Sequence, residues 1–289
     1  MDRIIKAYAL NKNALVTVAN TTKLVEQIKN IHDLTPTTAA VLGRVATMGT
    51  IMAHTAMKDE NENITIQLNG DGPIGKIICV ASVKQKNAEI KIYTNNPQTE
   101  LPLNPNGKLD VGGAVGKTGY LNIIKENKMT GKNYNGLVPL VSGEIAEDFT
   151  HYYAKSEQKP TVIALGVLVD KNGIKAAGGY MINLMPEATD DDITKLENTI
   201  NNVENISKML EDNKSLEEIA KIITGDDNVE ILENDLNVEY FCGCSAERFK
   251  NSILTLKKED IDEIFKNDEK INVKCEFCNK QYDFYKNDF

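Results

Sequence analysis

Alternating hydrophobic and polar positions dominate the first two-thirds of the chain. Runs rich in β-branched residues, bounded by Gly, Asn, Asp or Pro, predict strands in this region. The clearest runs are residues 14–18, 64–68, 77–83, 90–93 and 161–169. Because such strands follow one another in groups with few helices between them, the pattern favours an α+β fold built on a mainly antiparallel sheet.

Two helices are expected to pack against these strands. Thr35 can cap a helix, and Pro36 then occupies its first helical position. This helix runs to about Met57 through many small residues, which predicts that it is buried and closely packed by sheets. A second helix is expected over residues 142–155.

The segment from residue 185 to 235 has a helical period instead. Apolar residues recur mostly at three- and four-residue steps from Ile193 to Leu210, which predicts one apolar stripe. A capping box at Ser215 begins another helix, and Gly225 ends it. Since isolated helices of this length are marginal in water, both need a partner that covers their apolar face.

Charge divides the chain in the same way. Of its 289 residues, 41% are hydrophobic and 26% charged, as in an ordinary globular protein, and the net charge is −9. Residues 1–184 carry 20 basic and 16 acidic side chains, residues 185–235 carry 4 and 15, and residues 236–289 carry 9 and 11. We therefore predict an N-terminal core domain (1–184), an acidic and solvated helical linker (185–235) and a small C-terminal domain (236–289).

Several partners and locations are excluded by the same features. A nucleic-acid surface would need clustered Lys and Arg, which the acidic block opposes. The longest apolar stretch, residues 162–169, is far shorter than the ~20 residues that span a bilayer. The N-terminus has no apolar core of signal-peptide length. We expect a cytoplasmic protein that binds neither nucleic acid nor membrane.

The C-terminal domain is expected to contain short helices over residues 245–256 and 259–265 and strands over 271–274 and 281–285. About 54 residues are too few for a comfortable hydrophobic core, so a covalent or metal staple is expected.

Four of the five cysteines supply that staple. Cys242, Cys244, Cys275 and Cys278 form C-x-C, a gap of 30 residues, and C-x-x-C. An odd number of cysteines in a chain without an export signal argues against a disulfide framework. Four thiolates in two close pairs are the ligand set of tetrahedral zinc, so we predict that these residues bind one zinc ion. Cys79 lies in an apolar run and is expected to be an inert buried thiol.

A zinc site of this kind is either a static staple or a switch. Structural zinc contributes roughly 10–16 kcal/mol of apparent binding free energy, nearly all of it folding free energy. A disulfide that closes a loop of three or four residues constrains the unfolded chain by only ~2 kcal/mol. Two local disulfides therefore cannot replace the metal, and oxidation is expected to unfold the domain.

Three segments resemble enzyme motifs, but each lacks a feature that its motif requires. Residues 70–75 match G-x-G-x-x-G, but Pro73 and the following β-branched run predict a hairpin turn. Residues 111–118 resemble a P-loop whose first glycine is replaced by Val111. No nucleophile-elbow pattern surrounds Ser142, although Asp148 and His151 are close in sequence. We expect that the protein is not an enzyme.

The C-x-C and C-x-x-C tail, on a chain of this length, resembles the redox-regulated heat-shock protein 33 family of bacterial holdase chaperones. The similarity extends along nearly the whole chain, and its other segments are residues 70–74, 116–125, 134–158, 177–180 and 185–186.

This resemblance implies a mechanism. In the reduced state Cys242, Cys244, Cys275 and Cys278 bind one zinc ion, and the protein is an inactive monomer. Hypochlorous acid, or peroxide with heat, forms the disulfides Cys242–Cys244 and Cys275–Cys278 and releases zinc. The C-terminal domain and the linker unfold, and homodimers hold unfolding client proteins without ATP during oxidative stress. We expect the stripe from Ile193 to Leu210 to become exposed on activation.

Two other classes of protein share the four cysteines. A zinc-ribbon nucleic-acid-binding protein would show a basic surface. A thiol–disulfide oxidoreductase would use Cys275 and Cys278 catalytically, and normally places the first cysteine at a helix N-terminus.

Overall fold

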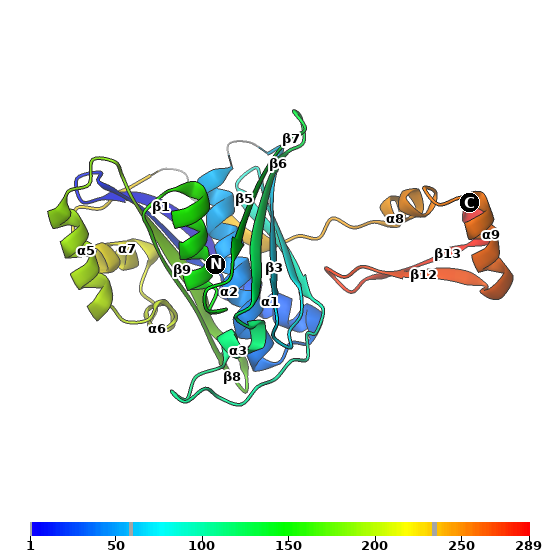
Figure 1. The fold of residues 1–289 in the computed structure, drawn as a ribbon, viewed down its shortest axis with the longest axis horizontal. Helices are drawn as coiled ribbons and strands as arrows, with labels where there is room; N and C mark the ends of the chain where they lie inside the picture. Colours follow the sequence, from blue (N-terminus) through cyan, green and yellow to red (C-terminus); the bar gives the residue numbers. More distant parts are fainter. Residues whose placement is uncertain (1, 58–59, 233–235) are drawn as a thin grey trace. The chain divides into compact units, whose positions relative to one another are not determined.

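The computed structural model describes residues 2–57, 60–232 and 236–289 (Figure 1). The chain forms two compact units, Met1–Tyr240 and Phe241–Phe289. Both combine helices with strands, so the predicted α+β class is confirmed.

An 11-stranded sheet organises the first unit. Its strands are β1 (Arg3–Ala9), β2 (Ala14–Asn20), β3 (Glu62–Gly70), β4 (Ile77–Lys84), β5 (Asn87–Thr94), β6 (Gly119–Asn127), β7 (Lys132–Pro139), β8 (Thr161–Asp170), β9 (Gly173–Leu184), β10 (Glu230–Ile231) and β11 (Leu236–Tyr240). Their order is β7-β6-β3-β4-β5-β11-β1-β2-β9-β8, and β10 also pairs with β1. Among the described strands only β5 and β11 run parallel, so the prediction of a mainly antiparallel sheet is confirmed.

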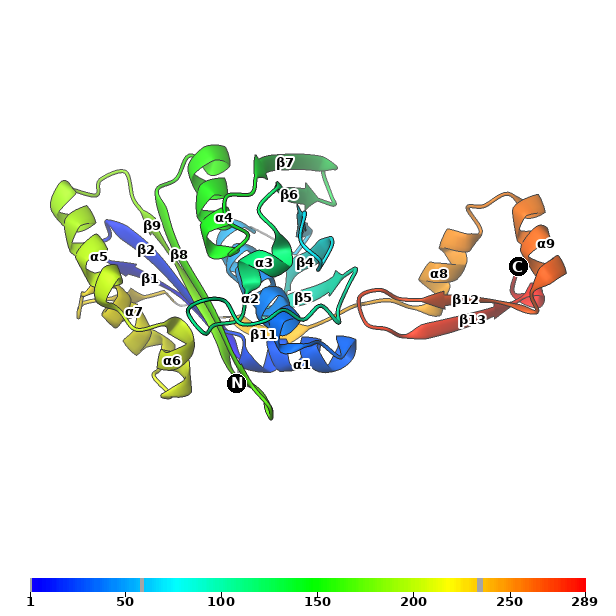
Figure 2. The same ribbon diagram turned by 60° about the horizontal axis from the view of Figure 1, so that its bottom comes forward.

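The first unit also contains helices on both faces of this sheet (Figure 2). They are α1 (Thr22–His32), α2 (Pro36–Ala56), α3 (Val111–Val115), α4 (Ala146–Tyr152), α5 (Asp190–Asn202), α6 (Ile206–Glu211) and α7 (Leu216–Thr224). None of the helices in the described ranges is long and apolar enough to cross a membrane.

Helix α2 forms the centre of the main core, as its small residues predict. Thr35 caps it by accepting a hydrogen bond of 3.3 Å from the Thr38 N–H. The helix contacts β4 and β5 on one side and β8 and β9 on the other. A Cβ on Gly49 would lie 3.0 Å from the Cys79 sulfur, and one on Gly43 only 2.7 Å from Val167. The strands therefore approach the helix backbone at these two positions.

The second predicted helix begins later than expected. Residues 142–145 are not helical, and α4 starts at Ala146 and continues into a π-helical turn, Tyr153–Glu157. The buried Asp148 carboxylate accepts hydrogen bonds from the backbone N–H groups of Val141, Ser142 and Ile145 at 2.7, 3.2 and 3.0 Å. These bonds hold the preceding residues in a tight turn, which replaces the first helical turn that the sequence suggested.

The acidic linker forms three helices where two were expected. The predicted stripe from Ile193 to Leu210 is divided between α5 and α6, because the chain becomes extended at Val203. The break lets α6 pack on β8 and β9 while α5 contacts α7. Both predicted caps are present, at Ser215 and Gly225.

The partner of the linker helices is the outer face of β1, β2 and β9. In Figure 1, α5, α6 and α7 lie on one side of these strands and α2 on the other. We call this apolar contact the linker interface, and its fully or nearly buried members are Ile5, Val16, Val18, Tyr180, Ile182, Leu196, Ile206, Met209, Leu210, Leu216, Ile219 and Ile223.

Strand β11 differs from the expectation for residues 236–240, which composition assigned to the C-terminal domain. It pairs with β5 through four residues and with β1 through Asn237 and Leu236. Leu236, Val238 and Tyr240 pack against the main core, and this burial holds the segment in the sheet. The division between the two units therefore falls after Tyr240, beyond the boundary expected at residue 236.

The second unit is small. It contains α8 (Ala246–Ile253), α9 (Lys258–Asn267), the antiparallel pair β12 (Lys270–Lys274) and β13 (Gln281–Tyr285), and a final 3₁₀ turn, Lys286–Asp288. Each predicted helix and strand of this region is found.

Candidate metal centre

The four cysteines of the tail come from two tight turns in the second unit. Cys242 and Cys244 lie just before α8, on either side of Gly243, whose φ is +65°. Cys275 and Cys278 lie in the turn between β12 and β13. That turn is closed by hydrogen bonds from the Cys275 N–H to the Lys280 carbonyl (2.9 Å) and from the Asn279 N–H to the Cys275 carbonyl (2.8 Å).

The structure brings all four sulfurs together. Every Sγ atom lies within 4.8 Å of the other three. The Cys242 and Cys275 sulfurs are 3.5 Å apart, and those of Cys244 and Cys278 are 3.3 Å apart. Zinc–sulfur bonds of about 2.3 Å in a tetrahedron place the sulfurs about 3.8 Å from one another. The donor set and its dimensions fit a tetrahedral metal of the zinc type.

The thiols of this cluster differ in acidity. Burial acts to raise the pKa of Cys244, but hydrogen bonds from the Tyr282 hydroxyl and from the neighbouring thiols outweigh it and lower that pKa to about 7. Burial, followed by the contact with Cys275, raises the pKa of Cys242. Burial likewise raises the pKa of Cys278. Four thiolates this close together repel one another, and a bound cation would offset that repulsion.

Tyr282 is the member of this site that sequence reasoning missed. Its hydroxyl lies 3.1 Å from the Cys244 sulfur, and its ring packs on Phe249 with the centroids 5.2 Å apart. The sequence does place a tyrosine in the strand after the C-x-x-C turn, which could have suggested a contact with the cysteines. The alternation of polar and apolar residues in that strand does not show which side chain reaches a sulfur.

Cys79 is separate from the cluster, as expected. It lies on β4 with no exposed surface, and burial raises the pKa of its thiol to about 12. A thiol in this environment is a weak nucleophile.

The other sequence motifs that could have formed an active site have structural roles instead. Residues 70–75 form the hairpin turn between β3 and β4, with Leu68 opposite Ile77. Val111 begins the five-residue helix α3, and β6 follows from Gly119, so residues 111–118 do not form a P-loop. The Asp148 carboxylate accepts hydrogen bonds from three backbone N–H groups, one of them that of Ser142, and so has a structural role in the turn.

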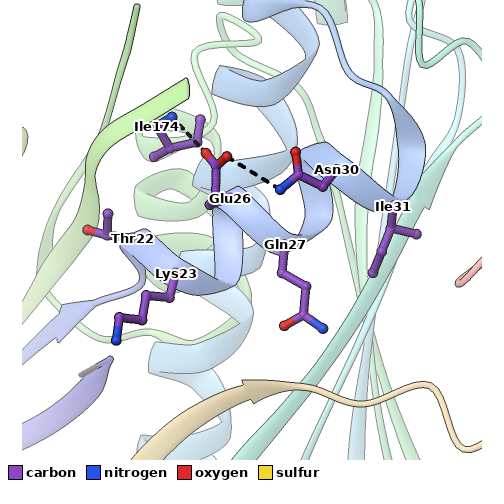
Figure 3. A pocket seen from close by; sticks show the side chains of 7 residues that line it. All are labelled: Thr22, Lys23, Glu26, Gln27, Asn30, Ile31 and Ile174. Atoms are coloured by element: carbon purple, nitrogen blue, oxygen red, sulfur yellow. Dashed lines mark hydrogen bonds between the residues drawn. The ribbon is translucent and has the colours of Figure 1, made fainter. Parts of the chain in front are cut away.

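A shallow hollow also lies along α1 (Figure 3). Its Glu26 carboxylate accepts hydrogen bonds from the Ile174 N–H (2.7 Å) and from the Asn30 side chain (3.4 Å). The first bond fastens α1 to the start of β9 and the second lies within α1, so the hollow has no converging set of chemical groups comparable with the four cysteines.

Comparison with known proteins agrees with these features. The family model described as Hsp33 protein matches residues 2–285. The chain is 42% identical over 288 residues to the 33 kDa chaperonin of Acetivibrio thermocellus, covering 99% of this chain and 95% of that protein. It is 40% identical over 281 residues to the 33 kDa chaperonin of Clostridioides difficile, covering 97% and 94%.

A solved structure shows the same fold. The crystal structure of the 33 kDa chaperonin from Thermotoga maritima matches with a TM-score of 0.89 and 30% identity, over 99% of this chain and 96% of that one. Sequence and fold agree along nearly the whole length, and the chain therefore belongs to the Hsp33 family of chaperones.

Proposed function

We propose that the protein is a redox-regulated, ATP-independent holdase that binds unfolding proteins after its four clustered cysteines are oxidised. One observation carries this proposal: the second unit has almost no core of its own. Among its described residues only Ile261, Cys275 and Phe284 are buried, and α8 buries none. Its fold must therefore depend on what the cysteines bind.

Cys242, Cys244, Cys275 and Cys278 would hold one zinc ion in the reduced protein. A bound zinc ion supplies folding free energy, and its charge stabilises the thiolate form of the cysteines. The close approach of the four sulfurs supports this assignment.

Oxidation removes these ligands. Each pair of zinc-bound thiolates would lose two electrons and form one sulfur–sulfur bond. One molecule of hypochlorous acid would take up these two electrons and one proton from water and be reduced to chloride and water, and the zinc ion would be released. We propose the pairs Cys242–Cys244 and Cys275–Cys278. In the folded unit the Cys242 sulfur lies 3.5 Å from the Cys275 sulfur, and the Cys244 sulfur lies 3.3 Å from the Cys278 sulfur. Local pairs nevertheless remain close when the unit loosens, whereas the longer loops cost more entropy to close.

Unfolding of the second unit would affect the linker helices because the two are joined directly along the chain. Cys242 follows β11 after a single residue, and β10 and β11 connect the second unit to α7. Release of α5, α6 and α7 would expose both halves of the linker interface, which are apolar. Apolar surface of this kind binds unfolding clients and favours the dimer that we propose for the active state.

The remaining features agree with this function. Cysteines that bind a metal as thiolates need a reducing compartment, which supports a cytoplasmic location for the site proposed here. The acidic linker opposes nucleic-acid binding. Because residues 111–118 do not form a P-loop, they offer no support for ATP-driven cycling.

The test is to count zinc and free thiols before and after hypochlorous acid and to assay suppression of client aggregation on both samples. We expect one zinc ion and five thiols before, no zinc and one thiol after, and suppression only after oxidation. Peptide mapping should find Cys242–Cys244 and Cys275–Cys278. The variant Cys79→Ala, changed outside the cluster, should switch like the parent protein.

Three results would contradict the proposal: no gain in suppression after zinc loss, disulfides between the two pairs such as Cys242–Cys275, or full suppression by the reduced protein. Filter binding at low salt and turnover in insulin reduction test the two rival classes. Positive results would favour a nucleic-acid-binding protein or an oxidoreductase, respectively.

A further inference from the structure

The Tyr282 side chain is fixed against the metal centre by three elements. It lies on β13, opposite Val273 of β12. Its ring packs on Phe249 of α8, with the planes tilted by 44°. Its hydroxyl lies 3.1 Å from the Cys244 sulfur and 3.3 Å from the Cys244 carbonyl oxygen. Because a phenol carries one proton, it donates to one of these two acceptors at a time, and the sulfur is the nearer.

We propose that Tyr282 is a positioning residue for the metal centre: its hydroxyl donates a hydrogen bond to the Cys244 thiolate, which strengthens metal retention and raises the amount of oxidant needed to open the site. The inference rests on the proposed role of the four cysteines as ligands. The spacing of the four cysteines in the sequence does not predict this role for Tyr282.

The physical argument concerns charge on sulfur. The Cys244 and Cys278 sulfurs are only 3.3 Å apart, so two thiolates there repel each other strongly. A donated hydrogen bond withdraws electron density from Cys244, reduces this repulsion and fixes the direction of the sulfur. The same withdrawal makes the thiolate a weaker nucleophile toward an oxidant. Partners of metal ligands at this distance typically contribute 10–100-fold to metal affinity.

The chain offers a matched pair of variants. Tyr282→Phe removes the hydroxyl and keeps the ring that packs on Phe249. Tyr285→Phe removes a hydroxyl from the same strand, at a side chain that is 54% exposed and lies outside the cluster. Both variants of the full-length protein are reconstituted with one equivalent of zinc, and circular dichroism checks that the helix content is unchanged.

Zinc retention is measured by competition with a chromogenic chelator, without any chaperone assay. We expect Tyr282→Phe to weaken zinc binding by at least about tenfold and to lose zinc at lower hypochlorous acid. Tyr285→Phe should remain within twofold of the parent. In cobalt-substituted protein, the sulfur-to-metal charge-transfer band should move to longer wavelength in Tyr282→Phe, because the thiolate has lost its donor.

Zinc affinity within twofold of the parent, together with an unmoved charge-transfer band, would overturn the proposal. Loss of affinity in Tyr282→Leu but not in Tyr282→Phe would also overturn it, since the ring alone would then explain the role. These outcomes are independent of client binding. If the parent protein retains zinc but never suppresses aggregation, the holdase function is wrong. The effect of Tyr282 on zinc affinity can still be measured in that case.

Discussion

Arg3 and Glu217 are 214 positions apart in the chain and form an ion pair between β1 and α7. The Arg3 Nη2 atom lies 2.5 and 2.8 Å from the two Glu217 carboxylate oxygens. Two more acids of the linker make similar contacts: Asp192 accepts from the Asn13 side chain (2.8 Å), and Asp226 accepts from the Leu10 N–H (2.7 Å). These acidic side chains are therefore not simply solvated, as the charge pattern alone suggested, but fasten the linker to β1 and to the turn between β1 and β2.

These contacts predict a pH dependence. Burial opposes ionisation of Glu217, but the backbone of its own helix and the Arg3 guanidinium outweigh burial and lower the pKa below its ordinary value of 4.5. Hydrogen bonds from Thr189 and Asn13 lower the pKa of Asp192 below 3.8. Since both folded-state pKa values are depressed, these groups stabilise the docked linker fully above about pH 4.5. The stabilisation is lost as the pH falls through the lower folded values.

The measurement is urea unfolding of reduced, zinc-loaded protein between pH 7 and pH 3. Glu217→Gln should lose about 0.5 kcal/mol of stability at pH 7, a small value because the two side chains are 38% and 35% exposed. It should also show a weaker loss on acidification than the parent. Glu197→Gln, on α5, serves as the control. Equal pH dependence in Glu217→Gln and the parent would refute the assignment.

At the scale of single residues, the sequence predicts some of the contacts in the structure and not others. The clustering of the four cysteines could be predicted because close spacing in the chain places them together in two turns. The partners Arg3 and Glu217, or Tyr282 and Cys244, become neighbours only through the tertiary fold, and no local pattern marks them. The turn held by Asp148 escaped prediction for a related reason, since its carboxylate competes with helix formation at residues 142–145.

At the scale of elements, amphipathic pattern was sufficient to find the linker helices but not their partner. The stripe from Ile193 to Leu210 required a covering surface, and the sequence did not specify which one. The structure provides it as the outer face of β1, β2 and β9. The break between α5 and α6 lets α6 pack on β8 and β9 while α5 contacts α7, and the hydrophobic period of the sequence does not predict it.

Helix α7 allows the linker interface to be tested without any oxidant. Ile219 has no exposed surface, whereas Ile222 on the same helix is 37% exposed. Ile219→Asp would place an uncompensated charge in the interface at a cost of roughly 3–5 kcal/mol, so the linker should detach. We expect this variant to suppress client aggregation while fully reduced and still loaded with zinc. Ile222→Asp should behave like the parent protein.

Zinc content, thiol count and aggregation are measured on the same samples, together with hydrogen exchange over residues 190–224. Unchanged exchange protection in Ile219→Asp would show that the helix remains docked in spite of the charge. Suppression without loss of protection would show that clients bind elsewhere, contrary to the role proposed for the linker interface.

At the scale of the whole molecule, stability is divided between two units with different sources. The first has an extensive apolar core around α2 and the linker interface. The second has three buried residues among those described, together with its cluster of four cysteine sulfurs. Short fragments of this composition rarely fold without a metal or disulfides.

Removal of metal should therefore unfold one unit and spare the other. With a chelator and a thiol reductant, we expect proteolysis to degrade residues 241–289 and to leave a resistant fragment that contains the large sheet. Zinc added before the protease should protect the tail. A tail that resists protease equally with and without metal would contradict the dependence on the cysteine cluster.

The position of β11 has a consequence for biosynthesis. Strands β1 and β5 do not pair with each other and are joined through β11, which lies in the last fifth of the chain. Before β11 is translated, the nascent chain can form two partial sheets, one that ends at β1 and one that ends at β5. The continuous sheet cannot form until β11 joins these two open edges. Open edges of this kind are templates for wrong pairing. We therefore expect the nascent chain to pass through an aggregation-prone stage before β11 is synthesised.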